Sequence, residues 1–111
     1  MKVTIRTHNI LLTSEEDAEV RRRLARTLER ISPWIVAADL TIADVNGPKG
    51  GVDKQCRLRI SGRSIPRTVI EQAGAHTLAT VANVAHRAEQ AVLRRLARLR
   101  EFTLGQRRAY P

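Results

Sequence analysis

The sequence predicts an α+β fold, a two-layer β-α-β-β-β-α domain in which two helices pack on one face of a four-stranded sheet. Three observations lead to this expectation. The chain has 111 residues, the length of one domain. Its hydrophobic residues, 42% of the total, can fill one modest core. Its apolar residues follow a period of two or of 3.6 in the order strand, helix, three strands, helix.

The first two elements are a half-buried strand and an amphipathic helix. Apolar and polar residues alternate from Lys2 to His8, as in a strand with one face on a core. A hydroxyl cap at Thr13 or Ser14 and an acidic turn then mark a helix start. The helix is expected to run through Ile31, because Pro33 disfavours its continuation. Opposite its apolar stripe lie the arginines Arg22, Arg26 and Arg30.

Three strands are expected next. The first, Ile35 to Asp44, alternates so that four side chains should face the core, namely Val36, Ala38, Leu40 and Ile42. The second, Gln55 to Ser61, should pair with it through a glycine-rich loop as an antiparallel hairpin. The third should run from about Ile65 to Gln72. Pro66 would place the start of this strand at an edge or a bulge.

The last element is the longest, a helix from His76 to about Phe102. Gly105 is a candidate stop after it. The chain is therefore divided into a domain of residues 1–102 and a short basic tail of residues 103–111 that is expected to be disordered. The helix should pack an apolar stripe on the sheet. Its opposite face carries His76, Thr80, Asn83, Arg87, Arg94 and Arg98, with Arg95 at the flank.

Charge is the clearest indication of function. The chain has 20 Lys and Arg against 11 Asp and Glu, a formal charge of +9. Such a surface favours a polyanion, because phosphate contacts release counterions, although an ordinary basic surface without such a partner is the alternative. With one Trp, one Tyr and one Phe, the chain lacks the aromatic platforms that RNA readers use to stack bases. The expected contacts are therefore to phosphates, made by arginines of both helices.

No pattern predicts catalysis, a metal site or a cofactor. The stretch from Asn46 to Lys54, NGPKGGVDK, lacks the spacing of a phosphate-binding loop and is followed by a strand. Cys56 alternates with core positions and is expected to be a buried structural thiol. The carboxylates are scattered, and the histidines lack metal-ligand spacing. The single cysteine, the strand at the start of the chain and the lack of a long apolar run indicate a cytoplasmic protein without a membrane partner.

The order of elements and one loop resemble a known family. The stretch DVNGPKGGVDKQC, from Asp44 to Cys56, and the basic last helix are similar to the ribosome hibernation-promoting and ribosome-associated inhibitor family, also known as sigma-54 modulation proteins. The resemblance covers Met1 to about Phe102. It implies a fold like the double-stranded RNA-binding domain (dsRBD) with an extra first strand. It also implies a non-enzymatic stress factor that occupies the mRNA and the A-site and P-site tRNA positions of the small ribosomal subunit.

The resemblance also implies which residues contact 16S rRNA. They are Arg22, Arg23, Arg26 and Arg30 in the first helix and Arg87, Arg94, Arg95 and Arg98 in the second. Lys49 and Lys54 are expected as peripheral contacts, and the protein is expected to be monomeric off the ribosome. Long members of the family have a second domain that dimerises ribosomes, and the resemblance here is to the short form without that domain. The resemblance therefore leaves open whether this protein promotes or prevents the pairing of ribosomes. The other hypothesis is a regulatory module that binds an acidic protein, such as a transcription factor.

Overall fold

The computed structural model describes residues 1–45 and 53–109, with side chains as far as Arg100. Lys49 lies outside the described residues. The predicted α+β order is confirmed, with a short 3-10 helix added before the second strand. The elements are β1 (Lys2–His8), α1 (Ser14–Thr27), the 3-10 helix η1 (Glu29–Trp34), β2 (Ile35–Asp44), β3 (Lys54–Gly62), β4 (Thr68–Gly74) and α2 (Thr77–Ala109).

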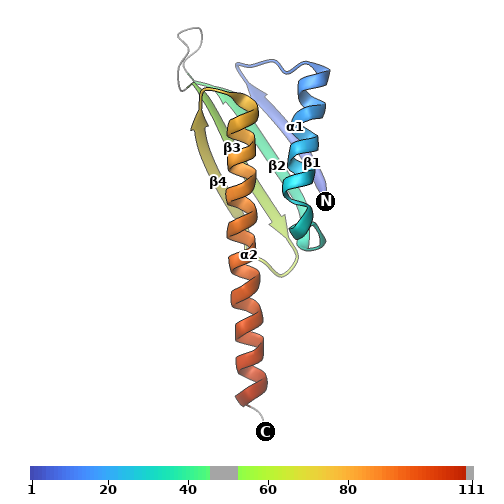
Figure 1. Ribbon diagram of the computed structural model, residues 1–111, viewed down its shortest axis with the longest axis vertical. Helices are drawn as coiled ribbons and strands as arrows, with labels where there is room; N and C mark the ends of the chain where they lie inside the picture. Colours follow the sequence, from blue (N-terminus) through green and yellow to red (C-terminus); the bar gives the residue numbers. More distant parts are fainter. Residues whose placement is uncertain (46–52, 110–111) are drawn as a thin grey trace.

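The four strands form one mixed sheet in the order β1-β2-β3-β4. β1 and β2 are parallel and are connected through α1, whereas β3 and β4 continue the sheet in antiparallel pairs. Both helices lie on the same face of the sheet, and α2 extends well past its lower end (Figure 1). The opposite face of the sheet is left without a covering layer, as in a two-layer α+β domain.

The core lies between the sheet and the two helices. Every strand and helix contributes aliphatic side chains to it. On β3, Cys56, Leu58 and Ile60 are fully buried, while Arg57 and Arg59 between them are exposed, as the period of two predicts. The expected burial of the Cys56 thiol is confirmed, and burial raises its pKa to about 11.

The start of α1 is fixed by a capping box. Glu16 donates its backbone N–H to Thr13 Oγ1 at 3.0 Å, and Thr13 donates its own to Glu16 Oε1 at 3.1 Å. The end of the helix differs from the expectation. α1 ends at Thr27, and Arg30 lies on η1, because Pro33 has no N–H and its ring would clash with the carbonyl of Glu29 in an α-helix.

Val36 does not face the core as expected. It is 51% exposed, whereas Ile35 is buried. The register between β2 and β3 shifts between Ile35 and Ala37, so Val36 is an extra residue in the ladder and the alternation is displaced at this point. From Ala38 to Ile42 the predicted alternation holds, because the ladder is regular again.

The last two elements also differ from their expected bounds. β4 begins after Pro66, at Thr68, and occupies a sheet edge. α2 continues past Phe102 to Ala109, beyond the helix end expected from the sequence. A single glycine such as Gly105 costs a helix about 1 kcal/mol and need not end it. The division into a domain of residues 1–102 and a separate tail stays a prediction.

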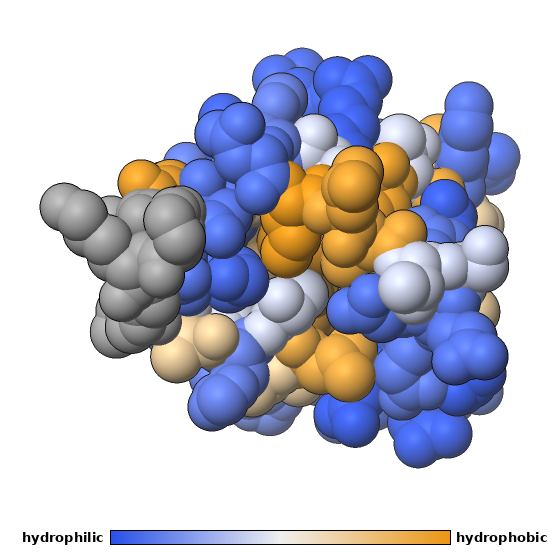
Figure 2. Space-filling view, turned by 90° about the horizontal axis from the view of Figure 1, so that it is seen from above, coloured by the Kyte–Doolittle hydropathy of each residue, from blue (hydrophilic) through white to orange (hydrophobic). Residues whose placement is uncertain are grey.

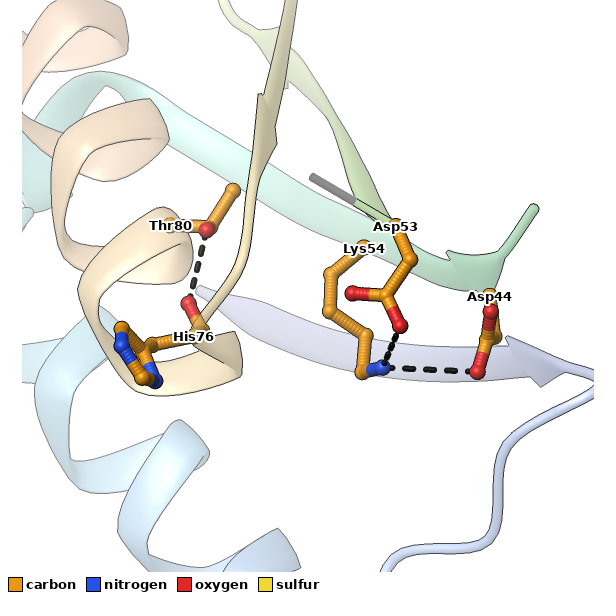
Figure 3. Close-up of polar contacts among 5 residues, drawn as sticks. All are labelled: Asp44, Asp53, Lys54, His76 and Thr80. Carbon is orange, nitrogen blue, oxygen red and sulfur yellow. Dashed lines mark hydrogen bonds and ion pairs between the residues drawn. The ribbon is translucent and has the colours of Figure 1, made fainter. Parts of the chain in front are cut away.

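Thr80 is buried, although it was expected on the outer face of α2. Its hydroxyl donates to the carbonyl oxygen of His76 at 2.7 Å, which satisfies the buried group within the first turn (Figure 3). Among the described residues, no helix is long and apolar enough to cross a membrane.

The end of the molecule with the β1–α1 connection exposes apolar residues. In the view onto this end, they gather at its centre and are surrounded by hydrophilic ones (Figure 2). Leu11 is 93% exposed, and Val45 at the end of β2 is 58% exposed. Neither side chain belongs to the core, so truncating Leu11 removes almost no buried surface.

Gly62 is expected to be intolerant of any side chain. A Cβ at this position would collide with the carbonyl oxygen of Trp34 and would lie 2.7 Å from Cδ1 of Ile65. We expect Gly62→Ala to lower the free energy of unfolding by about 1–3 kcal/mol, the usual effect of overpacking. Urea denaturation followed by circular dichroism measures it. Ser61→Ala, one residue earlier in β3, is the control, and an equal effect of both variants would refute this account.

Candidate nucleic-acid interface

The solvent-facing sides of α1, η1 and α2 carry several of the predicted arginines. The two helices contact each other beside the sheet, and α2 also contacts η1 before it extends past the sheet (Figure 1). Their apolar residues are buried toward the sheet, so most of their polar residues point to solvent. We call six of these exposed arginines the arginine surface: Arg22, Arg23, Arg26, Arg30, Arg94 and Arg98. On α2, Arg94 and Arg98 share the side of Arg87, because seven and eleven residues are close to whole numbers of turns.

A hollow of about 200 Å³ lies between the two helices on this surface. It is lined from α1 by three arginines and one glutamate, and from α2 by Ala82. The small side chain of Ala82 leaves the space open. The lining residues are Glu19, Arg22, Arg23, Arg26, Thr27 and Ala82. With three positive charges against one negative, the hollow is suited to an anionic group.

The arginines of this surface differ in how strongly they are engaged. Arg22 pairs with Glu19, and Arg23 Nε lies 3.3 Å from Glu19 Oε1. No hydrogen bond or ion pair joins Arg26, Arg94 or Arg98 to any other described residue, and all three are exposed. Exposed ion pairs contribute little to stability, so Arg22 and Arg23 can exchange Glu19 for a phosphate at small cost. Arg26, Arg94 and Arg98 have no such contact to lose.

Arg87 and Arg95 make hydrogen bonds within the protein. Arg87 Nη1 donates to the carbonyl of Glu71 at 3.0 Å and to Gln72 Oε1 at 2.7 Å. Arg95 Nη1 donates to the carbonyls of Pro66 and Arg67 at 3.1 and 3.3 Å. Glu71 lies on β4, which is an edge strand of the described sheet, and Pro66 and Arg67 lie in the segment before it. Both arginines therefore attach α2 to β4 and the segment before it, and their contact with rRNA stays a prediction.

Lys54 is held between two carboxylates at the start of β3. Its Nζ lies 2.8 Å from Asp53 Oδ2 and 3.3 Å from Asp44 Oδ2 (Figure 3). The side chains of Lys54 and Asp53 are only 18% and 7% exposed. The hydrogen bond with Asp53, supported by Asp44, raises the pKa of Lys54 above its usual 10.5. This geometry favours a structural tie at the base of the hairpin, and the expected peripheral rRNA contact of Lys54 stays a prediction.

We expect Lys54→Met to destabilise the protein, because it leaves the buried Asp53 carboxylate without its cation. At pH 7 the midpoint of thermal unfolding should fall by several degrees more than in Lys2→Met, an exposed control on β1. Replacing Asp53 with Asn in the same variant should restore part of the loss. No recovery in this double variant would contradict the proposed tie.

The ion pair between Lys54 and Asp53 also predicts how the stability of the wild-type protein changes at alkaline pH. Since the folded-state pKa of Lys54 is raised, its contribution to stability is complete below pH 10.5 and is lost as the pH rises through the folded-state pKa. The unfolding midpoint of the wild type should therefore fall more steeply above pH 10.5 than that of Lys54→Met. Parallel slopes for the two proteins would contradict this assignment.

Within the described residues, no group of three or more His, Cys, Asp or Glu side chains is placed to hold a metal ion. The arrangement offers positive charge around a hollow, which is suited to binding anions. Thr27 and Ala82, which line the hollow between the helices, were not identified from the sequence. No residue pattern marks them, because their role depends only on how α1 and α2 are placed.

Comparison with known proteins supports the fold at low sequence identity. No family model and no curated protein matches the chain. A ribosomal subunit interface protein from Coxiella burnetii is similar with a TM-score of 0.75 and 10% identity, over 87% of this chain and 99% of that one. The Protein Y N-terminal domain from Thermus thermophilus is similar with a TM-score of 0.69 and 17% identity, over 85% and 98%. The fold implied by the family resemblance is thereby confirmed, while the likeness to the dsRBD stays a prediction.

Proposed function

We propose that this chain is a ribosome-associated hibernation or stress factor of the cytoplasm. It binds 16S rRNA at the decoding region of the small subunit and inhibits translation by occupying the channel of the mRNA and the A-site and P-site tRNAs. It acts without catalysis, as a monomer off the ribosome.

The arginine surface is the observation that carries this proposal. Four of its guanidinium groups, on Arg26, Arg30, Arg94 and Arg98, have no partner among the described residues. Two parallel helices spread this charge over an area that can contact several phosphates at once, which is the sequence-independent part of RNA affinity. The similarity in fold to a ribosomal subunit interface protein points to rRNA as the polyanion.

Sedimentation tests the proposal directly. The purified chain is mixed with small subunits, large subunits or total tRNA at low salt and separated on a sucrose gradient. We expect it to migrate with small subunits and to be released as the salt concentration rises, since phosphate contacts are salt-dependent. Added mRNA and initiator tRNA should compete with it. Migration with large subunits alone, or with neither subunit, would refute the proposal.

The other candidate is a regulatory module that binds an acidic protein through the same arginines. Salt weakens both modes of binding and cannot separate them. Ribonuclease does separate them, because only the rRNA complex is lost after digestion. We prefer RNA because the exposed apolar residues Leu11 and Val45 lie outside the arginine surface, whereas the centre of a protein–protein interface is usually apolar.

A further inference from the structure

The uncovered face of the sheet carries a second hollow, of about 150 Å³. That volume corresponds to about five water molecules, which leaves room for one phosphate group with part of its hydration shell. The strands β1, β2 and β3 supply its lining. Besides Leu40, the lining residues are Thr4, Arg6, Asp39, Thr41, Arg57 and Arg59.

The register of the sheet explains why these side chains meet. Arg6 is paired with Thr41, which is paired with Arg57 on its other side. Neighbouring strands are about 4.8 Å apart, so the two arginines stand roughly 10 Å from each other with the threonine between them. The next row toward the start of β1 is paired across the same three strands. It consists of Thr4, Asp39 and Arg59.

Alternation places both rows on the face away from the helices. Leu40 and Leu58, between the residues of these rows, are buried against α1 and α2, so their neighbours in sequence point the other way. Arg57 and Arg59 are accordingly exposed on the uncovered face. This hollow is therefore separate from the arginine surface, which lies on the opposite side of the molecule.

The hollow has an excess of positive charge. Three arginines line it against one carboxylate, and Arg59 Nη2 lies 3.3 Å from Asp39 Oδ2. Arg57 Nε lies 3.5 Å from Glu71 Oε1, outside the hollow. These exposed pairs orient two guanidinium groups without neutralising the third. No hydrogen bond or ion pair joins Arg6 to any other described residue.

We propose that this hollow is a phosphate-binding site, with the guanidinium groups of Arg6, Arg57 and Arg59 and the hydroxyls of Thr4 and Thr41 as its donors. Guanidinium forks bind phosphate oxygens through two parallel hydrogen bonds, and hydroxyls supply further donors beside them. The phosphate comes from RNA or from a small anion. With RNA, the chain contacts phosphates on both of its faces and lies between two segments of nucleic acid. The inference is independent of the function proposed for the arginine surface.

Nuclear magnetic resonance of the labelled full chain tests the site. The Nε–H signals of Arg6, Arg57 and Arg59 are followed during titration with inorganic phosphate and, separately, with a short uridine oligonucleotide. Shifts with both ligands identify a general phosphate site, and shifts with only one assign it to RNA or to small anions. These signals report on the uncovered face, whatever happens at Arg94 and Arg98. Absence of shifts with both ligands would overturn the proposal.

Three substitutions distinguish binding at this hollow from a general effect of the protein's net charge. Arg6→Gln should weaken binding at these signals roughly three- to fivefold, as expected of one exposed ionic contact. Lys2→Gln removes the same charge from the same strand outside the hollow and should change affinity by less than about twofold. Asp39→Asn should tighten binding, because it removes the only carboxylate of the lining. Equal losses in Arg6→Gln and Lys2→Gln, with circular dichroism unchanged, would refute the site.

Discussion

Reversing the charge of Arg26, Arg94 and Arg98 to Glu should reduce binding to small ribosomal subunits by about 100-fold or more at low salt. These three guanidinium groups are exposed and have no partner within the described part of the chain, so their entire charge is available to phosphates. Each reversal lowers the formal charge by two, which takes the chain from +9 to +3. Quantitative co-sedimentation at several salt concentrations measures the effect, and the salt dependence should become shallower.

A matched triple variant distinguishes a specific surface from net charge. Lys2, Arg63 and Arg67 are also exposed and lie outside both helices, so reversing them to Glu gives the same formal charge of +3. We expect this variant to retain most of its affinity. If both variants lost binding equally, the arginine surface would have no special role. Unchanged far-ultraviolet circular dichroism of both variants excludes unfolding as the cause.

Arg87 and Arg95 allow a finer distinction within α2. Sequence periodicity places them beside Arg94 and Arg98, and nothing in their residue type separates the two pairs. The difference arises because the Glu71 carbonyl on the edge strand β4 accepts a hydrogen bond from Arg87, and the Pro66 carbonyl before β4 accepts one from Arg95. Such long-range contacts depend on the packed fold. They could not be predicted from a helical pattern.

The fold itself was largely predictable because its information is local. Alternation defines β1, β2 and β3, and the hydroxyl and acidic residues around Thr13 define the start of α1. The errors arise where a non-local contact or a backbone irregularity decides the outcome. The bulge between Ile35 and Ala37 turns Val36 outward, and the hydrogen bond to the His76 carbonyl allows Thr80 to be buried.

The candidate site was predictable only in part for the same reason. Composition indicates a polyanion partner, and periodicity places arginines on the outer faces of two helices. The sequence does not show that Lys54 is held by Asp44 and Asp53, because it is the pairing of β2 with β3 that places Asp44 beside the lysine. It also does not show the hollow of the uncovered face, which requires the register of three strands.

Leu24→Ala should have the largest effect on stability, a loss of about 2–5 kcal/mol in the free energy of unfolding. Leu24 lies on α1 within the core and is fully buried, so its truncation leaves a cavity between the helix and the sheet. For a domain of this size, the midpoint of thermal unfolding should fall by on the order of 10–20 °C. Differential scanning calorimetry and urea denaturation measure both quantities.

Leu11→Ala provides the matched control, since it makes the same chemical change at a side chain that is 93% exposed. We expect its free energy of unfolding to stay within about 0.5 kcal/mol of the wild type. Leu24→Ala should still bind small subunits like the wild type at a temperature where this variant is folded, because the arginines of the arginine surface are unchanged. A normal unfolding midpoint for Leu24→Ala would contradict the packing of α1 on the sheet. Lost binding in the folded variant would instead mean that the interface depends on how tightly α1 is packed.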